Sequence, residues 1–499
     1  MLIEAAHDAG RAFTSTLSRE QQRELGQFMT PPAIATFMAR RLVAGVVSAH
    51  VRVLEPAAGS GVLAAAVVEK LLALAHPPSH IELQLYEIDK RLASHLRTFC
   101  QQMAEVCSQQ GVCLDWNVTA GDFLVSDLAL DGRPVEGLLV IANPPFFKLG
   151  AKDTRALAHS YAVWGQPNIY SLFMAACARL TPFGGRFCFI TPRSWMSGAY
   201  FRAARQSMLR DVSIEAMHAF ESRTDSFESD SVLQETMITW AVGRKTAEVG
   251  LPIVLTRSQG ADDIDDGEVQ TVPTERIISH DGSAMLSLPG AGADPFEGWP
   301  ATLGSHGLQV STGPVVAFRA VRHLHESAAH QTVPLLWMQH VGQQRIRWPL
   351  NKKREHIAAT AENAWMLLPN MPMVLMRRFS PKEAERRVVC ASYEGTLPGS
   401  VVGVENHLNY IHRPSGAMSV HETRGLAAYL SSRVVDSHLR ALAGTTQVNA
   451  VELRRLPLPP LERLIAIGMG LGPDPTLAQT DRAVEAALGM NLAEEEHAA

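Results

Sequence analysis

The feature that most restricts the fold of this chain is a strand-like segment that ends in a glycine turn and leads into an apolar helix. Residues 51–55, Val-Arg-Val-Leu-Glu, predict a short buried strand. Residues 56–61, Pro-Ala-Ala-Gly-Ser-Gly, predict a tight turn, and residues 62–75 predict an Ala-rich helix. Glycines in such a turn let the backbone approach a ligand closely. Strand and helix signals then alternate up to about residue 245, which predicts a mostly parallel sheet with helices on both faces.

The turn does not have the composition of a phosphate-binding loop. It lacks the G-x-G-x-x-G spacing, and no Gly-Lys-Ser or Gly-Lys-Thr follows it, so a pyrophosphate cradle is not expected. Glu55, at the end of the strand, would repel phosphate but could attract the positively charged amino acid part of S-adenosylmethionine. A second strand-like run, residues 81–89, places Glu87 near its end, where a carboxylate can accept both hydroxyls of a ribose.

The sequence Gly121-Asp122-Phe123 comes next along the chain. The Asp122 carboxylate can accept a hydrogen bond from an adenine amino group, while Phe123 or Ile88 packs on the adenine ring. Each signal is weak alone, because a surface glutamate or a Gly-Asp turn usually binds nothing. Their order along the chain is harder to obtain by chance.

Residues 143–146 read Asn-Pro-Pro-Phe and directly follow the apolar run 137–142. The side-chain carbonyl of Asn143 can accept one N–H of an exocyclic amino group. The C=O of Pro144 can accept the other, because a Pro-Pro unit has a fixed φ and leaves its carbonyls free. Two acceptors aim the amine lone pair at an electrophile, and Phe146 can stack on the base. The motif predicts methylation of an amino nitrogen, although Asn-Pro is also a common turn and Pro-Pro often only ends a strand.

The order of these motifs resembles that of a known family. Four motifs follow one another at about one strand-helix unit per step. They are the glycine turn, the predicted ribose-binding Glu87, Gly-Asp-Phe and Asn-Pro-Pro-Phe. In this the chain is similar to amino-group DNA methyltransferases of the adenine-N6 type, in the gamma arrangement typified by TaqI. The resemblance is strong over residues 20–245 and only suggestive after 300, where segments are similar to PstI-type methyltransferases. It implies a class I S-adenosylmethionine-dependent fold, a Rossmann-like seven-stranded α/β sheet whose final strand is antiparallel.

The resemblance also implies roles for particular residues. Residues 26–32, Gly-Gln-Phe-Met-Thr-Pro-Pro, are similar to a family segment that folds over the methionine end of the cofactor. Asn143, Pro144, Pro145 and Phe146 would orient and stack the target base. Phe227 is the candidate for a second stacking aromatic and Phe220 the alternative, while a loop phenylalanine packed in the core is the competing interpretation. The residues expected to hold S-adenosyl-L-methionine are Phe28, Thr30, Glu55, Ala57, Gly59, Gly61, Glu87, Ile88, Asp122, Phe123 and Asn143.

The net charge of −5 argues against a nucleic-acid partner, but the charge is unevenly distributed. Residues 249–300 hold nine acidic and two basic side chains, whereas residues 301–400 hold twelve basic and six acidic ones. Paired basic residues interleaved with tryptophans suit a groove that follows phosphates. A solvated basic face over core tryptophans is the alternative interpretation. The residues expected to bind double-stranded DNA are Arg345, Arg347, Lys352, Lys353, Arg354, Arg377 and Arg378.

Length and composition indicate more than one domain. With 499 residues, 46% of them hydrophobic, the chain can bury a large core. Residues from about 246 to 300 are rich in Gly, Asp and Pro, which is typical of a boundary. We therefore expect a catalytic domain at 1–245, a target-recognition domain that binds DNA at 246–465, and a C-terminal helical tail at 466–499.

Cysteine usage and hydropathy restrict the environment of the protein. The six cysteines form no C-x-x-C pair, so no zinc site, other metal site or disulfide framework is expected. Reduced core cysteines, the absence of a signal-peptide pattern and the absence of a bilayer-length apolar run indicate a cytoplasmic protein without membrane contact. We expect a monomer. No segment is left over that could hold a nuclease, so a cognate restriction endonuclease would be a separate chain.

The function that these patterns favour is transfer of methyl from S-adenosylmethionine to N6 of an adenine that is flipped out of duplex DNA. Cytosine N4 suits the same motif, but Phe146 in place of Tyr and the gamma order favour adenine. Asn-Pro-Pro-aromatic also occurs in methyltransferases of RNA bases and of a protein glutamine amide, which need no second domain of this size. A DNA-binding specificity protein without catalysis is the remaining alternative, and it would have no reason to keep both motifs.

Overall fold

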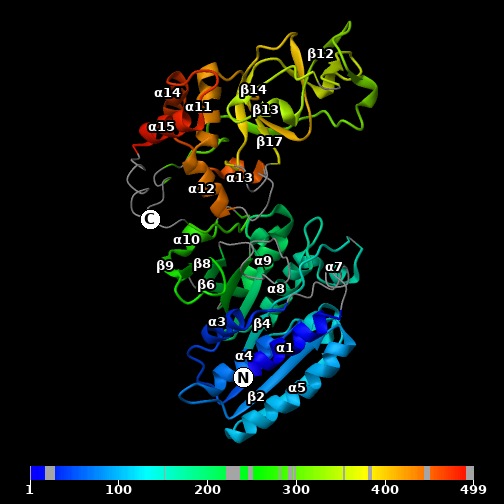
Figure 1. Ribbon diagram of the computed structural model, residues 1–499, viewed down its shortest axis with the longest axis vertical. Coiled ribbons are helices and arrows are strands. Elements are labelled where there is room, and N and C mark those ends of the chain that lie inside the picture. The colour runs from blue at the N-terminus through cyan, green and yellow to red at the C-terminus, as the bar shows by residue number, and fades with distance from the viewer. Residues whose placement is uncertain are drawn as a thin grey trace. The chain divides into compact units, whose positions relative to one another are not determined.

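The computed structural model describes most of the chain, divided between two compact units, Met1–Leu288 and Pro289–Ala499 (Figure 1). Four residues expected in functional roles, Phe28, Phe227, Lys352 and Lys353, lie outside the described residues. The described residues are 2–16, 29–150, 152–220, 236–244, 251–279, 282–289, 296, 299, 301–351, 354–379, 385–442 and 450–489.

The first unit is built on one large sheet. Within the described residues its strands are β1 (His50–Glu55), β2 (His80–Glu87), β3 (Cys113–Ala120), β4 (Leu138–Ala142), β5 (Arg186–Pro192), β6 (Val212–Phe220), β7 (Thr236–Gly243), β8 (Ile253–Ser258) and β9 (Glu268–Val272). They lie in the order β3-β2-β1-β4-β5-β7-β6-β8-β9. The pairs from β3 through β5 are parallel, and β7 is antiparallel to both β5 and β6. The Rossmann-like class I arrangement predicted from the sequence is confirmed, with two strands added at one edge.

Helices cover both faces of this sheet because its strands are apolar on both sides. In β4, Leu139 and Ile141 pack into the core on one face, while Leu138, Val140 and Ala142 pack into the core on the other. The first core contains α1 (Leu2–Thr14), α3 (Pro32–Leu42), α4 (Val62–Leu72) and α5 (Lys90–Gln109). The second contains α8 (Ile169–Leu180), α9 (Arg202–Asp211) and the short α6 (Asp127–Asp131), α7 (Thr154–Ala158) and α10 (Thr274–Ile277).

The first unit extends past the boundary expected near residue 245. Strand β8 pairs in parallel with β6, and β9 pairs with β8, so both belong to the large sheet. The acidic cluster 262–266 lies in the connection between β8 and β9. There the Asp263 carboxylate accepts the N–H groups of Gln259 and Gly260, at 2.8 Å each. The Gly- and Asp-rich composition therefore belongs to a hairpin turn, and the first unit ends at Leu288.

The second unit combines small sheets with a group of helices. A four-stranded sheet has the order β10-β20-β17-β18, a five-stranded sheet has the order β11-β15-β12-β19-β16, and β13 pairs with β14. The strands are β10 (Gln309–Thr312), β11 (Leu324–His325), β12 (Thr332–Leu336), β13 (Val341–Gly342), β14 (Arg345–Ile346), β15 (His356–Ala358), β16 (Leu367–Pro369), β17 (Pro372–Arg377), β18 (Cys390–Glu394), β19 (Val401–Val404) and β20 (Leu408–His412). The helices are α11 (Val420–Ser431), α12 (Arg433–Leu442), α13 (Ala450–Arg455), α14 (Leu461–Met469) and α15 (Leu477–Leu488).

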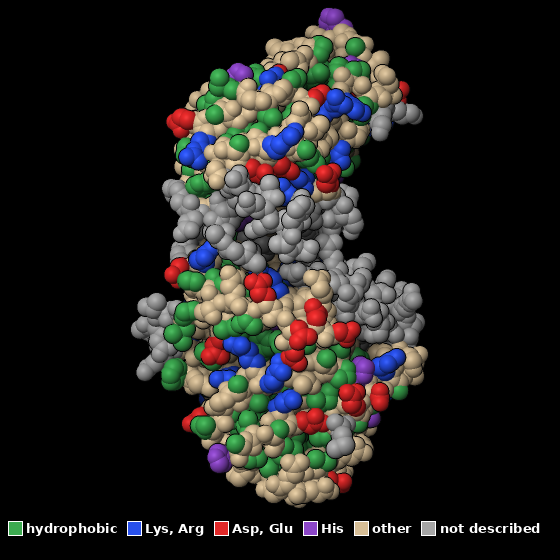
Figure 2. Space-filling view, turned by 60° about the vertical axis from the view of Figure 1, so that its left-hand side comes forward, with side chains coloured by type: hydrophobic (Ala, Val, Ile, Leu, Met, Phe, Trp, Pro, Cys, Tyr) green, Lys and Arg blue, Asp and Glu red, His purple; other side chains and the backbone are tan. Residues whose placement is uncertain are grey.

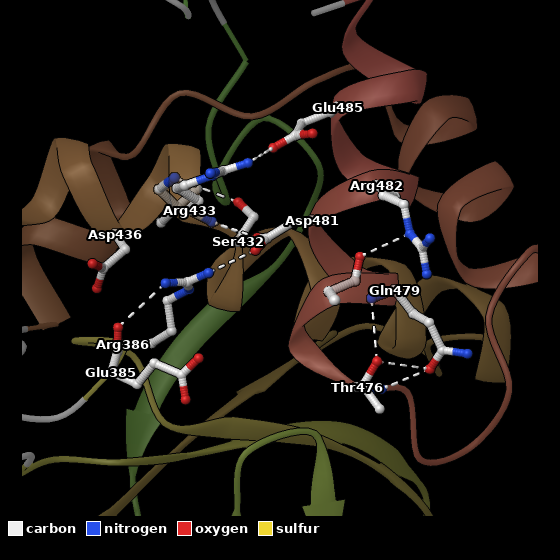
Figure 3. Close-up of polar contacts among 12 residues, drawn as sticks. Glu385, Arg386, Ser432, Arg433, Asp436, Thr476, Gln479, Asp481, Arg482 and Glu485 are labelled. Atoms are coloured by element: carbon white, nitrogen blue, oxygen red, sulfur yellow. Dashed lines mark hydrogen bonds and ion pairs between the residues drawn. The ribbon is translucent and has the colours of Figure 1, made fainter. Parts of the chain in front are cut away.

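The residues expected to form a separate tail from 466 onward pack into the second unit. Helices α11 and α14 cross so closely that a Cβ on Gly425 would lie 1.7 Å from the Leu464 carbonyl oxygen. Figure 3 shows Asp481 of α15 between Arg386 and Arg433. Its carboxylate pairs with the Arg386 guanidinium at 2.6 Å and accepts the Arg433 N–H at 2.7 Å. Burial of α14 and of this ion pair therefore makes residues 461–488 an integral part of the unit.

Five cysteines are buried, as expected for core residues, but Cys113 is exposed at the start of β3. Its thiol lies near His80 and Asp115, and ligand atoms of the three residues lie within 4.8 Å of one another. These are metal-ligating atom types, although His80 and Asp115 already share a hydrogen bond of 2.8 Å. Among the helices in the described part of the chain, none is long and apolar enough to cross a membrane.

Candidate active site

A cavity of about 320 Å³ lies at the carboxyl ends of β1, β2 and β4. This is where the strand order reverses direction, between β1 and β4, which is the usual position of a ligand in an open parallel sheet. The side chains and backbone that line it are Met29, Pro56, Ala57, Gly59, Tyr86, Glu87, Ile88, Gly121, Asp122, Phe123, Asn143, Pro145, Phe147, Arg155, Ile169 and Phe173. The glycine turn, the acid after β2, the Asp-Phe pair and the Asn-Pro-Pro segment therefore meet at one cavity.

The two glycines of the turn serve different purposes. Both have left-handed backbone, with φ of +56° at Gly59 and +88° at Gly61. Gly59 lines the cavity together with Ala57, which fits a close approach of backbone to a ligand. Gly61 does not line it, and a Cβ there would lie 2.7 Å from the Leu96 side chain of α5. Its small size is therefore required for packing between the turn and α5.

Glu87 lies in the cavity wall with its carboxylate held by backbone. One carboxylate oxygen accepts the Gly59 N–H and the other accepts the Asp89 N–H, at 2.8 Å each. The side chain is 7% exposed, and this burial raises its pKa above the ordinary value of 4.5. Because a carboxylate has about four acceptor positions, each oxygen can still accept a hydroxyl from the cavity. This arrangement fits the ribose-binding role predicted for Glu87.

Glu55 is not among the residues that line the cavity, which differs from its predicted position beside the methionine end of the cofactor. Its carboxylate accepts the Ala64 N–H at 2.9 Å and is 1% exposed. Ala64 is in the first turn of α4, where backbone N–H groups lack partners within the helix. Burial raises the pKa of Glu55 well above its usual value. The Glu55 carboxylate therefore faces the N-terminus of α4 instead of the cavity.

The Asp122-Phe123 pair forms another part of the wall. One Asp122 oxygen accepts the Leu124 N–H at 2.9 Å, and the other lies 3.6 Å from the Arg155 guanidinium. Arg155 also pairs with Asp153 at 2.7 Å and lies over the Phe147 ring. Phe123 is buried, whereas Ile88 is exposed at the cavity edge. Asp122 is thus fixed by a helix N-cap and a nearby cation, with its carboxylate on the cavity surface.

The Asn-Pro-Pro-Phe segment follows the buried strand β4, so its position is set by the centre of the sheet. The Asn143 side-chain N–H donates to the Thr30 hydroxyl at 3.1 Å. This bond joins the segment to the residues that precede α3 and holds the amide in one orientation. Pro145 lines the cavity, while Pro144 is buried. Phe146 does not line it and packs edge-on against Tyr170 of α8, with ring centroids 5.9 Å apart.

The N-terminal segment expected over the cofactor is described from Met29 onward. Met29 lines the cavity, and the Ser60 hydroxyl lies 3.8 Å from its sulfur. Thr30 is 5% exposed and contacts the cavity through Asn143. The described end of the segment therefore touches both the glycine turn and the Asn-Pro-Pro motif.

Sequence reasoning missed several cavity residues. Phe147, Ile169 and Phe173 contribute apolar surface to its wall. Ile169 and Phe173 lie on the buried helix α8, where the sequence gives no sign of which neighbour an apolar residue contacts. Phe147 was overlooked beside Phe146, although the first lines the cavity and the second does not. No sequence pattern indicates Arg155, since its role depends on the fold bringing it to Asp122.

The basic residues of the second unit divide into exposed and anchored side chains. Arg345, Arg347 and Arg354 are exposed. Arg377 and Arg378 are partly buried, and they donate to the carbonyls of Val341 and Asn406, respectively. Figure 2 shows Lys and Arg side chains dispersed among Asp and Glu on the visible face of each unit. The paired basic residues in the sequence therefore do not all form one charged surface.

Comparison with known proteins gives a consistent family. The model of the Eco57I restriction-modification methylase family matches residues 139–227, which include most of β4 and Asn143. The type II methyltransferase M.PstI of Providencia stuartii is 31% identical over 481 residues, covering 93% of this chain and 92% of that protein. The type II methyltransferase M.BsuBI of Bacillus subtilis is 32% identical over 460 residues, covering 90% of each. Because these likenesses span nearly the whole of both chains, the protein belongs to the type II methyltransferases of restriction-modification systems.

Proposed function

We propose that the protein transfers methyl from S-adenosylmethionine to N6 of adenine within a specific sequence of duplex DNA. The observation that carries the proposal is the position of Asn143, which lines the cavity and is oriented by Thr30 at the end of β4. An acceptor fixed there can take one N–H of the target amine. The neighbouring carbonyl of Pro144 can take the second, which leaves the amine lone pair available for attack.

The residues present fit the cofactor that the family implies. The cavity has an acceptor for ribose hydroxyls in Glu87, an acceptor for an adenine amino group in Asp122, and apolar surface from Phe123 and Phe147. When bound, S-adenosylmethionine supplies an electrophilic methyl group on its sulfonium. The backbone at Gly59 lets the ligand approach, and Met29 contributes to the wall near the glycine turn. Glu55 is left out of this assignment because its carboxylate faces α4.

Orientation of the two reactants accounts for the catalysis in this proposal. Direct displacement requires the amine lone pair and the methyl carbon to be aligned, and fixed positioning can supply much of the rate acceleration. No side chain of the cavity has to form a covalent bond. The target base leaves the helical stack to reach the cavity, because its amino group has no in-line path inside the duplex. Phe146, held against Tyr170, is the proposed stacking surface for that base.

Arg345, Arg347 and Arg354 of the second unit are proposed to contact DNA. Any of these guanidinium groups that binds phosphate oxygens releases condensed counterions, so affinity for DNA is expected to fall steeply as salt is raised. Arg377 and Arg378 contribute less directly, since each already donates to a backbone carbonyl. Methylation of cytosine N4 is the second candidate, because the same pair of acceptors suits both amino groups.

The proposal is tested by sequencing DNA from a methylation-free host that expresses the chain, with a readout that distinguishes N6-methyladenine from N4-methylcytosine. We expect N6-methyladenine in one short motif. Asn143→Ala should abolish the mark and leave S-adenosylmethionine binding, measured by calorimetry, within a few-fold of wild type. Detection of N4-methylcytosine in the motif would show that cytosine, and not adenine, is the target base. If no modified base is found in the DNA, the substrate would instead be an RNA base or a glutamine amide. Equal activity of Asn143→Ala and the wild type would refute the role of Asn143.

A further inference from the structure

Strands β13 and β14 form a two-stranded hairpin with a polar groove beside it. Val341 pairs with Ile346 and Gly342 pairs with Arg345. Val341 is fully buried and Ile346 packs on the same core, so this side of the hairpin faces the interior. The groove has a volume of about 490 Å³ and is lined by Gln339, His340, Gly342, Gln343, Arg345, Arg347, Arg377, Asp474, Pro475 and Thr476. Every one of these residues belongs to the second unit.

The hairpin turn is anchored by a buried amide. Gln344 has φ of +55° and is 3% exposed. Its side-chain amide donates to the Ala427 carbonyl at 2.8 Å and to the Ser431 hydroxyl at 2.7 Å, both in α11. Its backbone N–H donates to the Cys390 carbonyl of β18 at 2.8 Å. These contacts hold the hairpin on a helix and a strand, so the groove beside it has a fixed shape.

Two long polar side chains in this groove are available to a ligand. Across the residues that the structure describes, neither the Gln339 amide nor the Arg347 guanidinium has a hydrogen-bond or ion-pair partner. Both residues are exposed. Arg347 is nevertheless fixed at its backbone, because its N–H donates to the His340 carbonyl at 2.9 Å. An amide and a guanidinium are therefore presented from a rigid frame with their donors and acceptors unsatisfied by protein.

The other two arginines of the groove are already paired. Arg345 pairs with Asp474 at 2.9 Å, and Arg377 donates to the Val341 carbonyl at 2.5 Å. A groove made only to grip phosphates would gain nothing from the Asp474 carboxylate or from a neutral amide. The mixture instead matches base edges in the DNA major groove, which a two-stranded ribbon can enter. There an amide recognises adenine through N6 and N7, and a guanidinium recognises guanine through O6 and N7.

We propose that side chains flanking the β13–β14 hairpin read the target sequence, with Gln339, in the helical turn Met338–His340 before β13, recognising an adenine and Arg347, directly after β14, recognising a guanine by bidentate hydrogen bonds. This inference rests on the proposed action on duplex DNA and goes beyond it, because it assigns sequence choice to two side chains. Asp474 keeps Arg345 aligned along the groove wall. Arg345 is then a contact to the backbone of the DNA or a support for its neighbours, and it is not a base reader.

The test uses a duplex library with randomised positions, methylated by purified full-length protein and sequenced for the mark. Glutamate accepts from cytosine N4, so Gln339→Glu should change the preferred base at one position of the motif from adenine to cytosine. Arg347→Ala should reduce the preference for guanine at another position by roughly 5- to 150-fold, the discrimination of one bidentate pair. Arg319→Ala, which removes an exposed arginine outside the groove, is the matched control and should leave the motif unchanged.

The motifs of the two groove variants support or refute the base-reading roles of Gln339 and Arg347. If both groove variants keep the wild-type motif at every position, the hairpin does not read sequence. A uniform loss of methylation over all library members would also overturn it, since that is the behaviour of phosphate contacts. Thermal melting of the variants at the wild-type temperature would show that the exposed substitutions leave the fold intact. A wild-type protein that marks no DNA would refute the proposed function, whereas a wild-type motif with unaltered variants refutes only the base-reading assignment.

Discussion

At the scale of single residues, burial determines how the acids near the cavity behave. Glu55 and Glu87 both have a pKa raised by burial, but their carboxylates have different surroundings. Glu55 accepts from a helix terminus and is closed off from the cavity, while Glu87 keeps acceptor capacity on the cavity surface. The two strand-end acids look alike in the sequence. Only the direction of each side chain separates a structural acid from a candidate ligand-binding one.

The raised pKa of Glu87 predicts how stability and cofactor affinity change with pH. Since its pKa in the folded chain lies above 4.5, the folded state holds this proton more tightly than the unfolded state. Its contribution to stability is therefore full below the unfolded pKa and is lost as pH rises through the folded pKa. Ribose hydroxyls donate to the ionised form, so cofactor affinity should have the opposite trend and weaken on acidification through the raised pKa.

Calorimetric titration of S-adenosylmethionine across this range checks the expectation. Glu87→Gln should weaken binding at neutral pH by about 10- to 150-fold, the value of one hydrogen bond to a charged group, and should remove the acid-dependent step. Glu82→Gln, a half-buried acid paired with Arg52 elsewhere on β2, serves as the charge control. A step that persists unchanged in Glu87→Gln would show that another group titrates.

At the scale of elements, the glycine turn joins a backbone requirement to a packing requirement. Gly61→Ala places a Cβ against Leu96 and also occupies left-handed backbone. Gly45 has similar backbone, with φ of +74°, but has nothing within 4 Å of an added Cβ. Gly45→Ala should therefore cost about 1–2 kcal/mol through backbone strain alone. Gly61→Ala should cost about 1–3 kcal/mol more through overpacking.

Denaturant unfolding of the two variants measures the difference between them. Equal losses of stability would mean that α5 moves to accept the methyl group and that packing at Leu96 is not tight. The comparison isolates packing because both substitutions add the same atom to similar backbone.

The strands β1, β2 and β4 and the motifs at their ends could be predicted from sequence because each signal is local. The run 137–142 is apolar throughout, as expected for a strand buried on both faces. The hairpin of β8 and β9 could not be predicted in this way, since its composition resembles a linker and its pairing with β6 is long-range. The cavity residues Phe147 and Phe173 were missed for the same reason, because contact between distant segments leaves no local pattern.

At the scale of the whole molecule, two compact units imply two stabilities that can be changed separately. Asp481→Ala removes the partner of the largely buried Arg386 in the second unit. Breaking such a pair should destabilise that unit by about 3–5 kcal/mol. A saturating S-adenosylmethionine analogue should instead raise the transition of the first unit, by about 2.7 kcal/mol at a hundred times its Kd.

Scanning calorimetry distinguishes the two effects. We expect one transition to move with the mutation and the other to move with the ligand. Asp474→Ala breaks an exposed ion pair in the same unit and should change stability by less than about 1 kcal/mol. A single transition that shifts as a whole in both experiments would show that the units unfold together.

The anchored hairpin has a consequence for how such proteins diverge. Gln344 holds β13 and β14 on α11, whereas Gln339 and Arg347 make no side-chain hydrogen bond or ion pair in the described part of the chain. Substitutions at the two exposed positions therefore carry little cost in folding, while a change at Gln344 removes two buried hydrogen bonds to α11. Selection for stability and selection for a new recognition sequence then act on different residues of one short segment, so a lineage can explore new targets while keeping an inherited fold.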